Sequence, residues 1–462
     1  INAEYGDNQM QDVRSNPKNA WRLQILNDPI KKYVSVQSQN VPSNLYEHFK
    51  AICSIHQFIL QNLNKFPLNP DQVVQSYYNC GFYSKALEMY QLYVKNGSLA
   101  PNENFPHCIQ ERFSESKQFN YNKKEMILAS KQRRLLNIGN FMSQKIMLQN
   151  SPAFGNHFVA TENIKIGEIL MVEKCCILSN QHSDGTFHVV SVFPIQEQRD
   201  VFMQRFVGED ESEKQNLNMY GTQDAQASMF GDQAEEHISM MFKNTCLINH
   251  CCNFNVQRFE ISNVMFIRAC KNIRLGEQIF VAYFDPLKLK YSEFKRYNFF
   301  CRCNFCKNQM LLPIQKLSNI IKNPSDFNKA YMLDVLDQIY ELEPLDLGSQ
   351  FFEMIGDLIS RIYKDDSDMY SQISAITKFF SKAGINIDNF SVDDITFTIG
   401  QHSLLFTLAI CYYLTGQHEK FRNSVRTMQQ YWDFVYCGFV DLDEVLNRSM
   451  PKQLVTIWNK GK

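Results

Sequence analysis

Three closely spaced cysteines constrain the fold of this chain more than any other feature. Cys301, Cys303 and Cys306 form a C-x-C-x-x-C cluster, and Cys252 precedes them in a second cysteine-containing segment. Zinc prefers four soft or borderline ligands in a tetrahedron, and thiolates spaced one and two residues apart can wrap an ion from a single tight loop. The pattern therefore predicts one zinc site that ties the segment around Cys252 to the segment around Cys301.

Four short motifs surround this cluster in a fixed order. They read G-N-H-F-V-A-T-E-N-I-K-I-G-E at 155–168, N-H-C-C-N-F-N at 249–255, G-E-Q-I-F-V-A-Y at 276–283 and Y-N-F-F-C-R-C-N-F-C at 297–306. In order and content they resemble the SET and post-SET region of the SET-MYND methyltransferases, over roughly residues 150–310. The resemblance implies an α+β fold in which a SET domain of small β-sheets is closed by a zinc-binding post-SET segment.

The resemblance also implies roles for residues of the first three motifs. Asn156, in the first loop, would contact the cofactor S-adenosylmethionine (SAM), and Asn249 and His250 would hold its polar groups. Tyr283 matches the active-site tyrosine, whose hydroxyl faces the methyl group and the incoming amine. The expected activity is SAM-dependent methylation of protein lysine.

The fourth motif supplies the remaining parts of the implied site. Phe299 matches the aromatic residue that lies on the adenine, and Tyr297 would line the substrate channel. One structural zinc ion would hold both in place, bound by Cys252, Cys301, Cys303 and Cys306. Because four thiolates close such a site, the ion has no open position for catalysis.

Two positions depart from the family pattern. His157 replaces a glycine that lets the backbone run close to the cofactor, and Phe254 replaces a proline beside the pocket. Neither change touches the zinc ligands. The sequence therefore leaves open a catalytically inactive SET scaffold that acts through its helical parts, and a zinc protein of another class is a more distant alternative.

The chain divides by pattern into four parts. We expect an extended arm over 1–45, a helical domain over 46–149, the SET and post-SET domain over 150–310 and a second helical domain over 311–462. The family places a Cys- and His-rich MYND module after Lys174. The insert at 175–245 has no paired Cys or His spacing, so the module is expected to be absent.

The helical parts carry a repeat-like signal. The segment 77–90 resembles the turn of a tetratricopeptide repeat, and 403–432 has Tyr, Gly and Phe at similar spacings. An ordinary helical hairpin and a plain all-α domain explain the same patterns. Either way, we expect a protein substrate or protein partners at these helices, and the chain could be a subunit of a larger assembly.

Composition limits the partners and the compartment. Hydrophobic residues make up 44% and the formal net charge is −1, which fits a globular protein and argues against electrostatic binding to nucleic acid or membranes. No apolar run is long enough to span a bilayer. The 14 cysteines suit a reducing compartment, cytoplasm or nucleus. An organelle stays open, because the chain starts at Ile1 and a preceding leader would not be visible.

Overall fold

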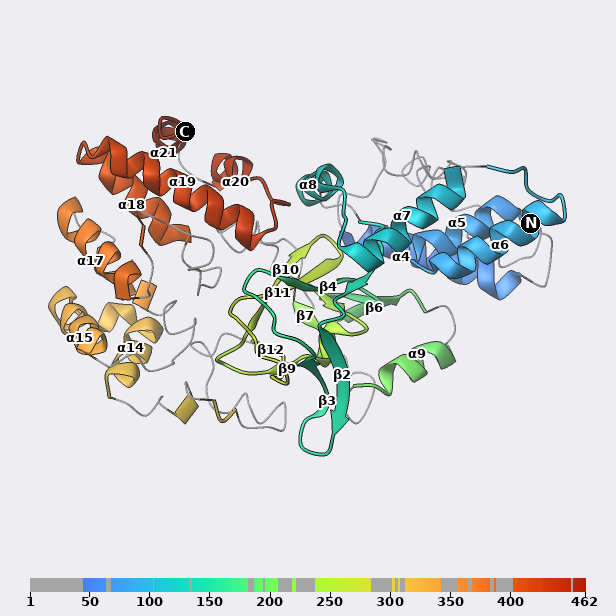
Figure 1. The fold of residues 1–462 in the computed structure, drawn as a ribbon, viewed down its shortest axis with the longest axis horizontal. Helices are drawn as coiled ribbons and strands as arrows, with labels where there is room; N and C mark the ends of the chain where they lie inside the picture. Colours follow the sequence, from blue (N-terminus) through green and yellow to red (C-terminus); the bar gives the residue numbers. More distant parts are fainter. Residues whose placement is uncertain are drawn as a thin grey trace.

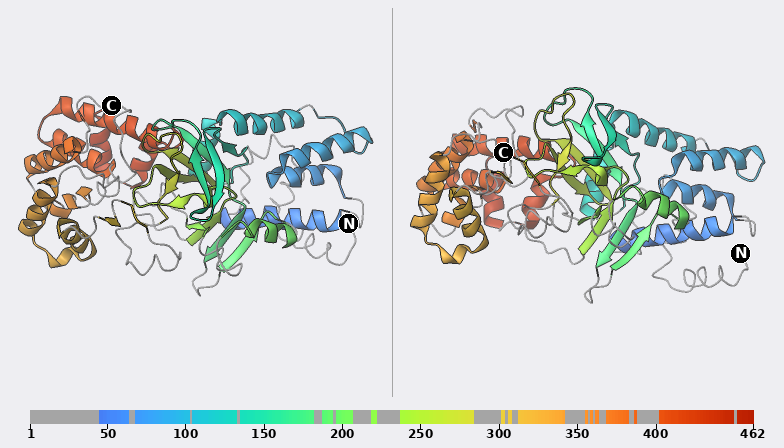
Figure 2. Two further views of the ribbon diagram at one scale, coloured as in Figure 1. Left: turned by 60° about the horizontal axis from the view of Figure 1, so that its bottom comes forward. Right: turned by 90° about the horizontal axis from the view of Figure 1, so that it is seen from below.

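The structure is a computed structural model, and it describes most of the chain beyond the first 44 residues. The described residues are 45–63, 68–102, 104–132, 135–181, 187–193, 196–206, 218–221, 237–283, 301–303, 306–307, 312–341, 355–356, 358–359, 361–363, 368–382, 386–387, 402–449 and 452–462. The arm predicted over 1–45 thus lies outside them, except for its last residue. Short strands occupy the centre of the molecule, with helices of the two chain halves on opposite sides (Figures 1 and 2).

Helices fill the N-terminal side. They are α4 (Leu45–Asn62), α5 (Pro70–Asn79), α6 (Tyr83–Lys95), α7 (Asn104–Gln118) and α8 (Lys123–Gln132). Helix α5 begins at a sequence-encoded cap, because the Asn69 side chain accepts the backbone N–H of Asp71 at 2.9 Å and Pro70 takes the first helical position. Local signals thus define where this helix starts.

Short strands form small sheets in the central domain. One antiparallel sheet has the order β1 (Phe141–Met142), β4 (Ile169–Lys174), β11 (Val264–Ala269), β10 (Val256–Ile261). A second has the order β6 (Phe187–Ser191), β5 (Ile177–Gln181), β8 (His237–Met241), β7 (Tyr220–Gly221). A hairpin joins β2 (Ile146–Ser151) to β3 (Gly155–Ala160), and β9 (Asn249–His250) pairs in parallel with β12 (Phe280–Val281).

The two central strands of the first sheet, β4 and β11, are buried on both faces. Successive side chains of a strand point to opposite faces, and β11 is fully buried along its length. Val264 and Phe266 join the core shared with the C-terminal helices, whereas Met265 and Ile267 join the core that includes Phe49 of α4. The sheet therefore links the two helical sides through its two faces.

Helices also fill the C-terminal side. They are α14 (Leu312–Lys322), the short 3₁₀ helix η3 (Pro324–Asp326), α15 (Lys329–Glu341), α17 (Met369–Lys382), α18 (His402–Leu414), α19 (His418–Val435), α20 (Leu442–Ser449) and α21 (Lys452–Asn459). Arg268 of β11 fastens them to the sheet: its guanidinium lies 4.2 Å from the ring centre of Phe434 and donates to the Phe434 carbonyl. Gly167 leaves space for that ring, since a Cβ there would lie 2.5 Å from it.

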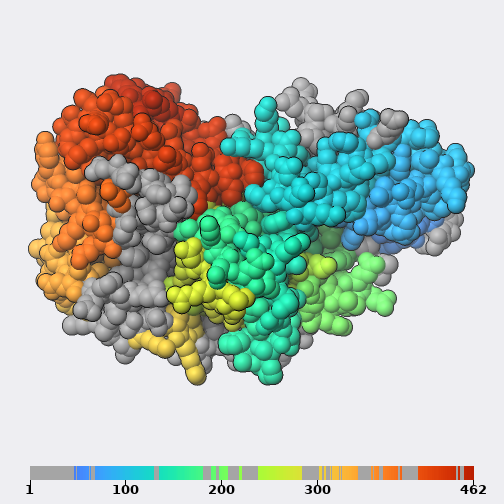
Figure 3. Space-filling view, in the orientation of Figure 1, coloured from blue at the N-terminus to red at the C-terminus, as the bar shows by residue number. Residues whose placement is uncertain are grey.

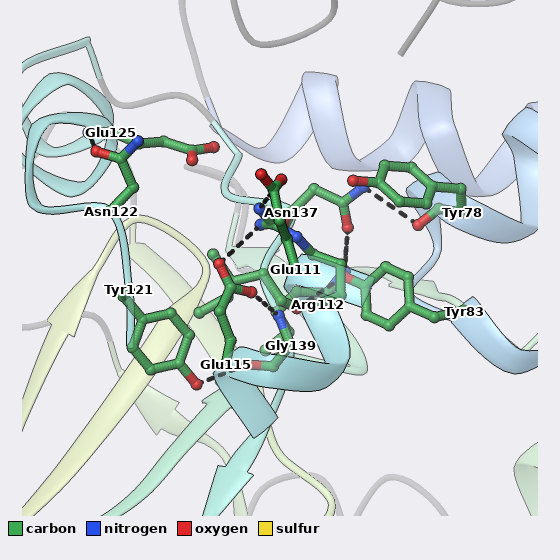
Figure 4. Close-up of polar contacts among 12 residues, drawn as sticks. Tyr78, Tyr83, Glu111, Arg112, Glu115, Tyr121, Asn122, Glu125, Asn137 and Gly139 are labelled. Atoms are coloured by element: carbon green, nitrogen blue, oxygen red, sulfur yellow. Dashed lines mark hydrogen bonds and ion pairs between the residues drawn. The ribbon is translucent and has the colours of Figure 1, made fainter. Parts of the chain in front are cut away.

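A polar network fastens the N-terminal helices to the central domain (Figure 4). The Tyr83 hydroxyl lies 2.7 Å from the Asn137 side-chain oxygen. Glu115 of α7 accepts the backbone N–H of Gly139 at 2.7 Å and pairs with Arg112 at 3.2 Å. The chain that leads into β1 is therefore held against α6 and α7 by buried polar contacts.

The two segments with a repeat-like pattern make the same turn. Gly81 ends α5 at φ +84° and donates to the Tyr78 carbonyl at 2.9 Å, while Gly416 ends α18 at φ +75° and donates to the Tyr413 carbonyl at 3.1 Å. In each, the next residue donates one carbonyl further back, which completes a Schellman cap. Both segments are helical hairpins, and their tetratricopeptide character stays a prediction.

The described architecture confirms the predicted mixture of helices with small sheets. No helix within the described ranges is long and apolar enough to cross a membrane. Of the insert predicted over 175–245, the structure describes strands β5 to β8 and helix α9 (Gln196–Met203), while 207–217 and 222–236 lie outside the described residues.

Candidate active site and metal centre

A buried glutamate anchors the turn that leads into β9. Glu173, the penultimate residue of β4, is 2% exposed. Its carboxylate accepts the backbone N–H of Asn244 at 3.0 Å, and both the N–H and the hydroxyl of Thr245 at 2.9 Å. Because these donors satisfy a carboxylate that is shielded from water, the 3₁₀ turn η2 (Thr245–Leu247) is held in one place directly before β9.

The pairing of β9 with β12 brings two of the sequence motifs together. Asn249 lies opposite Phe280, and His250 lies opposite Val281. Parallel strands need a long connection, and here it includes the β10–β11 hairpin. Tyr283, which follows β12, consequently lies beside His250.

Tyr283 contacts the β9 segment through both its backbone and its side chain. Its hydroxyl donates to the backbone carbonyl of Ile248 at 2.8 Å, and its backbone N–H donates to Nδ1 of His250 at 3.0 Å. Since Nδ1 accepts this bond, the ring proton of His250 is on Nε2, which lies 3.3 Å from Sγ of Cys252. The imidazole thus connects the predicted catalytic tyrosine to a predicted zinc ligand.

The two predicted cofactor-binding asparagines are half-buried, and their amides contact other loops. Asn249 donates from Nδ2 to the Phe154 carbonyl at 3.0 Å, which ties β9 to the end of the β2–β3 turn. Asn156 donates from Nδ2 to the Arg205 carbonyl at 3.2 Å and accepts from Asn150 at 3.0 Å. The first loop, the β9 segment and the end of α9 therefore meet at one place.

The two residues that depart from the family pattern are both buried. His157 is 5% exposed, and its Nδ1 lies 2.9 Å from the Gly155 carbonyl. Neighbouring strand residues point to opposite faces, so the imidazole and the Asn156 side chain lie on opposite sides of β3. Phe254 is 7% exposed. The His157 side chain thus leaves the Asn156 face of the strand open.

The four cysteines predicted to bind zinc converge. The sulfur atoms of Cys252, Cys301, Cys303 and Cys306 all lie within 4.8 Å of one another, and those of Cys252 and Cys306 are 3.4 Å apart. A tetrahedron with Zn–S bonds of about 2.3 Å places its sulfurs about 3.8 Å apart. The cluster could therefore hold one zinc ion with four thiolates and no open position.

Hydrogen bonds inside the cluster favour the thiolate form at two of the four cysteines, Cys301 and Cys303, whereas they raise the pKa of Cys252 and Cys306. Hydrogen bonds from the thiols of Cys251 and Cys252 lower the pKa of Cys303 to about 3, and the same two thiols lower the pKa of Cys301. Thiolate is the form that binds metal. Cys251 thus lies against the cluster although it is not one of the four converging sulfurs, and sequence analysis did not single it out.

Two predicted site residues, Tyr297 and Phe299, lie outside the described residues. One residue that sequence analysis missed, Arg205, lies at the site through its contact with Asn156. It sits in the insert, next to the end of α9, in a segment that has no family motif. Only the folded chain places it there.

The described residues fit a cofactor with adenosyl and amino-acid parts. Gly155 is exposed at φ +61°, and apart from its chain neighbours no atom lies within 4 Å of where its Cβ would be, so the rest of the chain does not cover this end of the first loop. Half-buried amides at Asn156 and Asn249 offer donors and acceptors around it. The Tyr283 ring, with its centre 5.4 Å from that of His250, forms an aromatic wall next to the β9 segment.

Comparison with known proteins finds a family match for the centre of the chain. Residues 155–284 match the SET domain family. Curated protein sequences give no match. A candidate histone methyltransferase from Plasmodium falciparum is similar in structure, at 17% identity and a TM-score of 0.19, covering 31% of this chain and 96% of that one. So is ctPRC2, solved in an autoinhibited conformation bound to S-adenosylmethionine, at 14% identity and a TM-score of 0.20, covering 69% of this chain and a third (33%) of that one.

Proposed function

We propose that this chain is a SAM-dependent protein-lysine methyltransferase of the SET type. The observation that carries the proposal is the position of Tyr283 inside the SET match, with its hydroxyl on the Ile248 carbonyl and its backbone on His250. Tyr283 is fixed beside the β9 segment by both its hydroxyl and its backbone N–H. This suits a reaction whose rate depends on the alignment of the reacting groups rather than on a strong acid or base.

The first loop and β9 would hold the cofactor. When bound, SAM supplies an activated methyl group on a sulfonium centre. Asn156 and Asn249 would orient it through their amides and backbones. Both ring nitrogens of His250 have partners inside the chain, so its part in binding would fall to the backbone.

Tyr283 would position the incoming amine. The Tyr283 hydroxyl donates its hydrogen bond to the Ile248 carbonyl, so the lone pairs of its oxygen would accept the N–H of the incoming amine. A lysine enters this reaction as a neutral amine, and removal from water in a substrate channel would disfavour its charged form. Tyr297 and Phe299 are proposed to line that channel and to cover the adenine, held there by a zinc ion in the four-cysteine cluster.

Binding and turnover together test the proposal. We expect the purified protein to bind SAM in a calorimetric titration and to transfer radiolabelled methyl groups to a lysine-containing protein or peptide pool. Tyr283→Phe should lower turnover at least tenfold while changing SAM affinity little, because the hydroxyl contacts the reacting amine. Tyr370→Phe is the control, since Tyr370 is 66% exposed on α17. Undetectable heat at high micromolar SAM would rule out the enzyme.

A second candidate function is a SET scaffold without catalysis. The observation in its favour is that His157 and Phe254 alter two positions beside the predicted cofactor loop. In that case the helical hairpins, which we propose to be tetratricopeptide-like, would bind protein partners. A protein that binds partners yet neither binds SAM nor transfers methyl groups would establish this alternative.

A further inference from the structure

Arg205 lies between two segments that the proposed function assigns to the cofactor. Its backbone carbonyl accepts the Asn156 amide at 3.2 Å, and its Nη2 lies 3.4 Å from the side-chain oxygen of Asn244. Asn244 starts the η2 turn that leads into β9, and Glu173 holds it from the other side. The guanidinium is therefore placed against the β9 side while the backbone is fixed to the first loop.

The segment around Arg205 is firmly packed. Phe202, Met203 and Phe206 are each at most 5% exposed and belong to the core of the central domain. The Phe202 ring packs at a tilt against the rings of Phe193 and Phe206, with ring centres 4.8 and 5.1 Å away. The insert around α9 thus lies beside the β2–β3 hairpin, as Figure 3 shows on one face of the molecule. Because its neighbours in the chain are buried in this core, the backbone of Arg205 has a defined position.

The charge of Arg205 has no counterion among the residues that the structure describes. Arg205 is half-buried, and among the described residues its side chain makes one hydrogen bond, the long one to the neutral Asn244. Arginine stays positively charged throughout the physiological pH range and binds carboxylates through two parallel N–H donors. A half-buried cation of this kind suits an anionic group that arrives from outside the chain.

We propose that Arg205 binds the carboxylate of the methionine part of SAM. This inference rests on the proposed function, which requires SAM at the Asn156 loop. Of the groups in that cofactor, only the carboxylate carries a negative charge, and amides or backbone donors alone leave its charge uncompensated. The insert would then line the cofactor site together with the first loop and the β9 segment. Arg205 would make binding specific for ligands that carry the carboxylate of SAM.

The experiment compares two ligands that differ in this carboxylate alone. SAM and decarboxylated S-adenosylmethionine are titrated calorimetrically into the wild-type protein and into Arg205→Gln. We expect the wild type to prefer SAM at least tenfold. We expect the variant to bind SAM about ten- to a hundredfold more weakly, as lost charge-assisted hydrogen bonds imply, while binding the decarboxylated ligand within twofold of wild type.

Two further variants keep the test decisive. Lys243→Gln removes an exposed cation next to Asn244 and should leave the preference for SAM unchanged. Arg205→Lys, which keeps the charge without the two parallel donors, should give an intermediate preference. Equal affinity of the wild type for both ligands would overturn the inference, and this result does not depend on whether Arg205→Gln folds. A folded Arg205→Gln variant that prefers SAM as strongly as the wild type does would also overturn it. If the wild type binds neither ligand, it is the proposed function that fails.

Discussion

Nδ1 of His250 accepts the backbone N–H of Tyr283 at 3.0 Å, so the predicted catalytic tyrosine is held by a ring that also touches the metal cluster. The other ring nitrogen, Nε2, lies 3.3 Å from Sγ of Cys252. One buried imidazole thus joins Tyr283 to the four-cysteine cluster, and loss of a metal ion bound by that cluster is expected to affect Tyr283 through it.

The loss of stability caused by removing the His250 imidazole should be coupled to the loss caused by removing the neighbouring Cys252 thiol. His250→Ala leaves a Tyr283 N–H without its partner, which costs about 1–3 kcal/mol of unfolding free energy. Because His250 and Cys252 share a contact, the effects of His250→Ala and Cys252→Ser on the melting temperature should be less than additive. His157→Ala, another buried histidine of the same domain, should add fully to Cys252→Ser. Additivity in both pairs would exclude the coupling.

The metal cluster makes a direct prediction about zinc content. Wild-type protein purified under reducing conditions should contain one zinc ion per chain by mass spectrometry of the metal, and Cys303→Ser should lose it. The melting temperature should fall with it, because binding of a structural metal contributes to folding free energy. Cys251→Ser is the matched control: its thiol touches the cluster but is not among the four converging sulfurs. If that variant loses the metal instead, the ligand assignment is wrong.

The N-terminal interface should respond to pH through Glu115. Burial raises its pKa to about 7 in the folded protein, from 4.5 for the ordinary side chain, although the Arg112 guanidinium opposes the shift. Between these two values the folded state holds a proton that the unfolded state releases, so this group's contribution to stability falls as pH rises, by at most about 1.4 kcal/mol per pH unit.

Glu115→Gln should remove that contribution. Between pH 5 and pH 7.5, the melting temperature of the wild type should therefore fall relative to that of Glu115→Gln. Glu111→Gln serves as the control, since Glu111 also faces Arg112 but is half exposed. If the wild type instead became more stable relative to Glu115→Gln as the pH rises over this range, the predicted upward shift of the Glu115 pKa would be wrong.

The two hairpin glycines should differ in their tolerance of alanine. Both have a positive φ, so Gly81→Ala and Gly416→Ala each incur about 1–2 kcal/mol of backbone strain. At Gly81 the new Cβ would also lie 2.8 Å from Nζ of Lys174, a buried amine already bonded to Asn137, whereas no atom lies within 4 Å at Gly416. Thermal unfolding should show the larger loss for Gly81→Ala. Equal losses would mean that Lys174 moves aside freely.

The sequence alone was enough to predict that the four cysteines converge. Metal ligands one and two residues apart have to share a loop, so the spacing of Cys301, Cys303 and Cys306 indicated their convergence before any coordinates. Glycines at the ends of α5 and α18 likewise marked turns, because a positive φ is a local demand of the backbone. These signals act over a few residues and can be read without knowing the rest of the fold.

Only the tertiary structure decided which groups surround the predicted cofactor loop. Arg205 and Asn156 are 49 residues apart and carry no shared pattern, yet they are hydrogen-bonded. The imidazole of His250 is directed to Tyr283 and Cys252, a choice that depends on how β9 pairs with β12. Contacts between distant segments arise when a common core packs them together, and no local spacing in the chain encodes which side chains then meet.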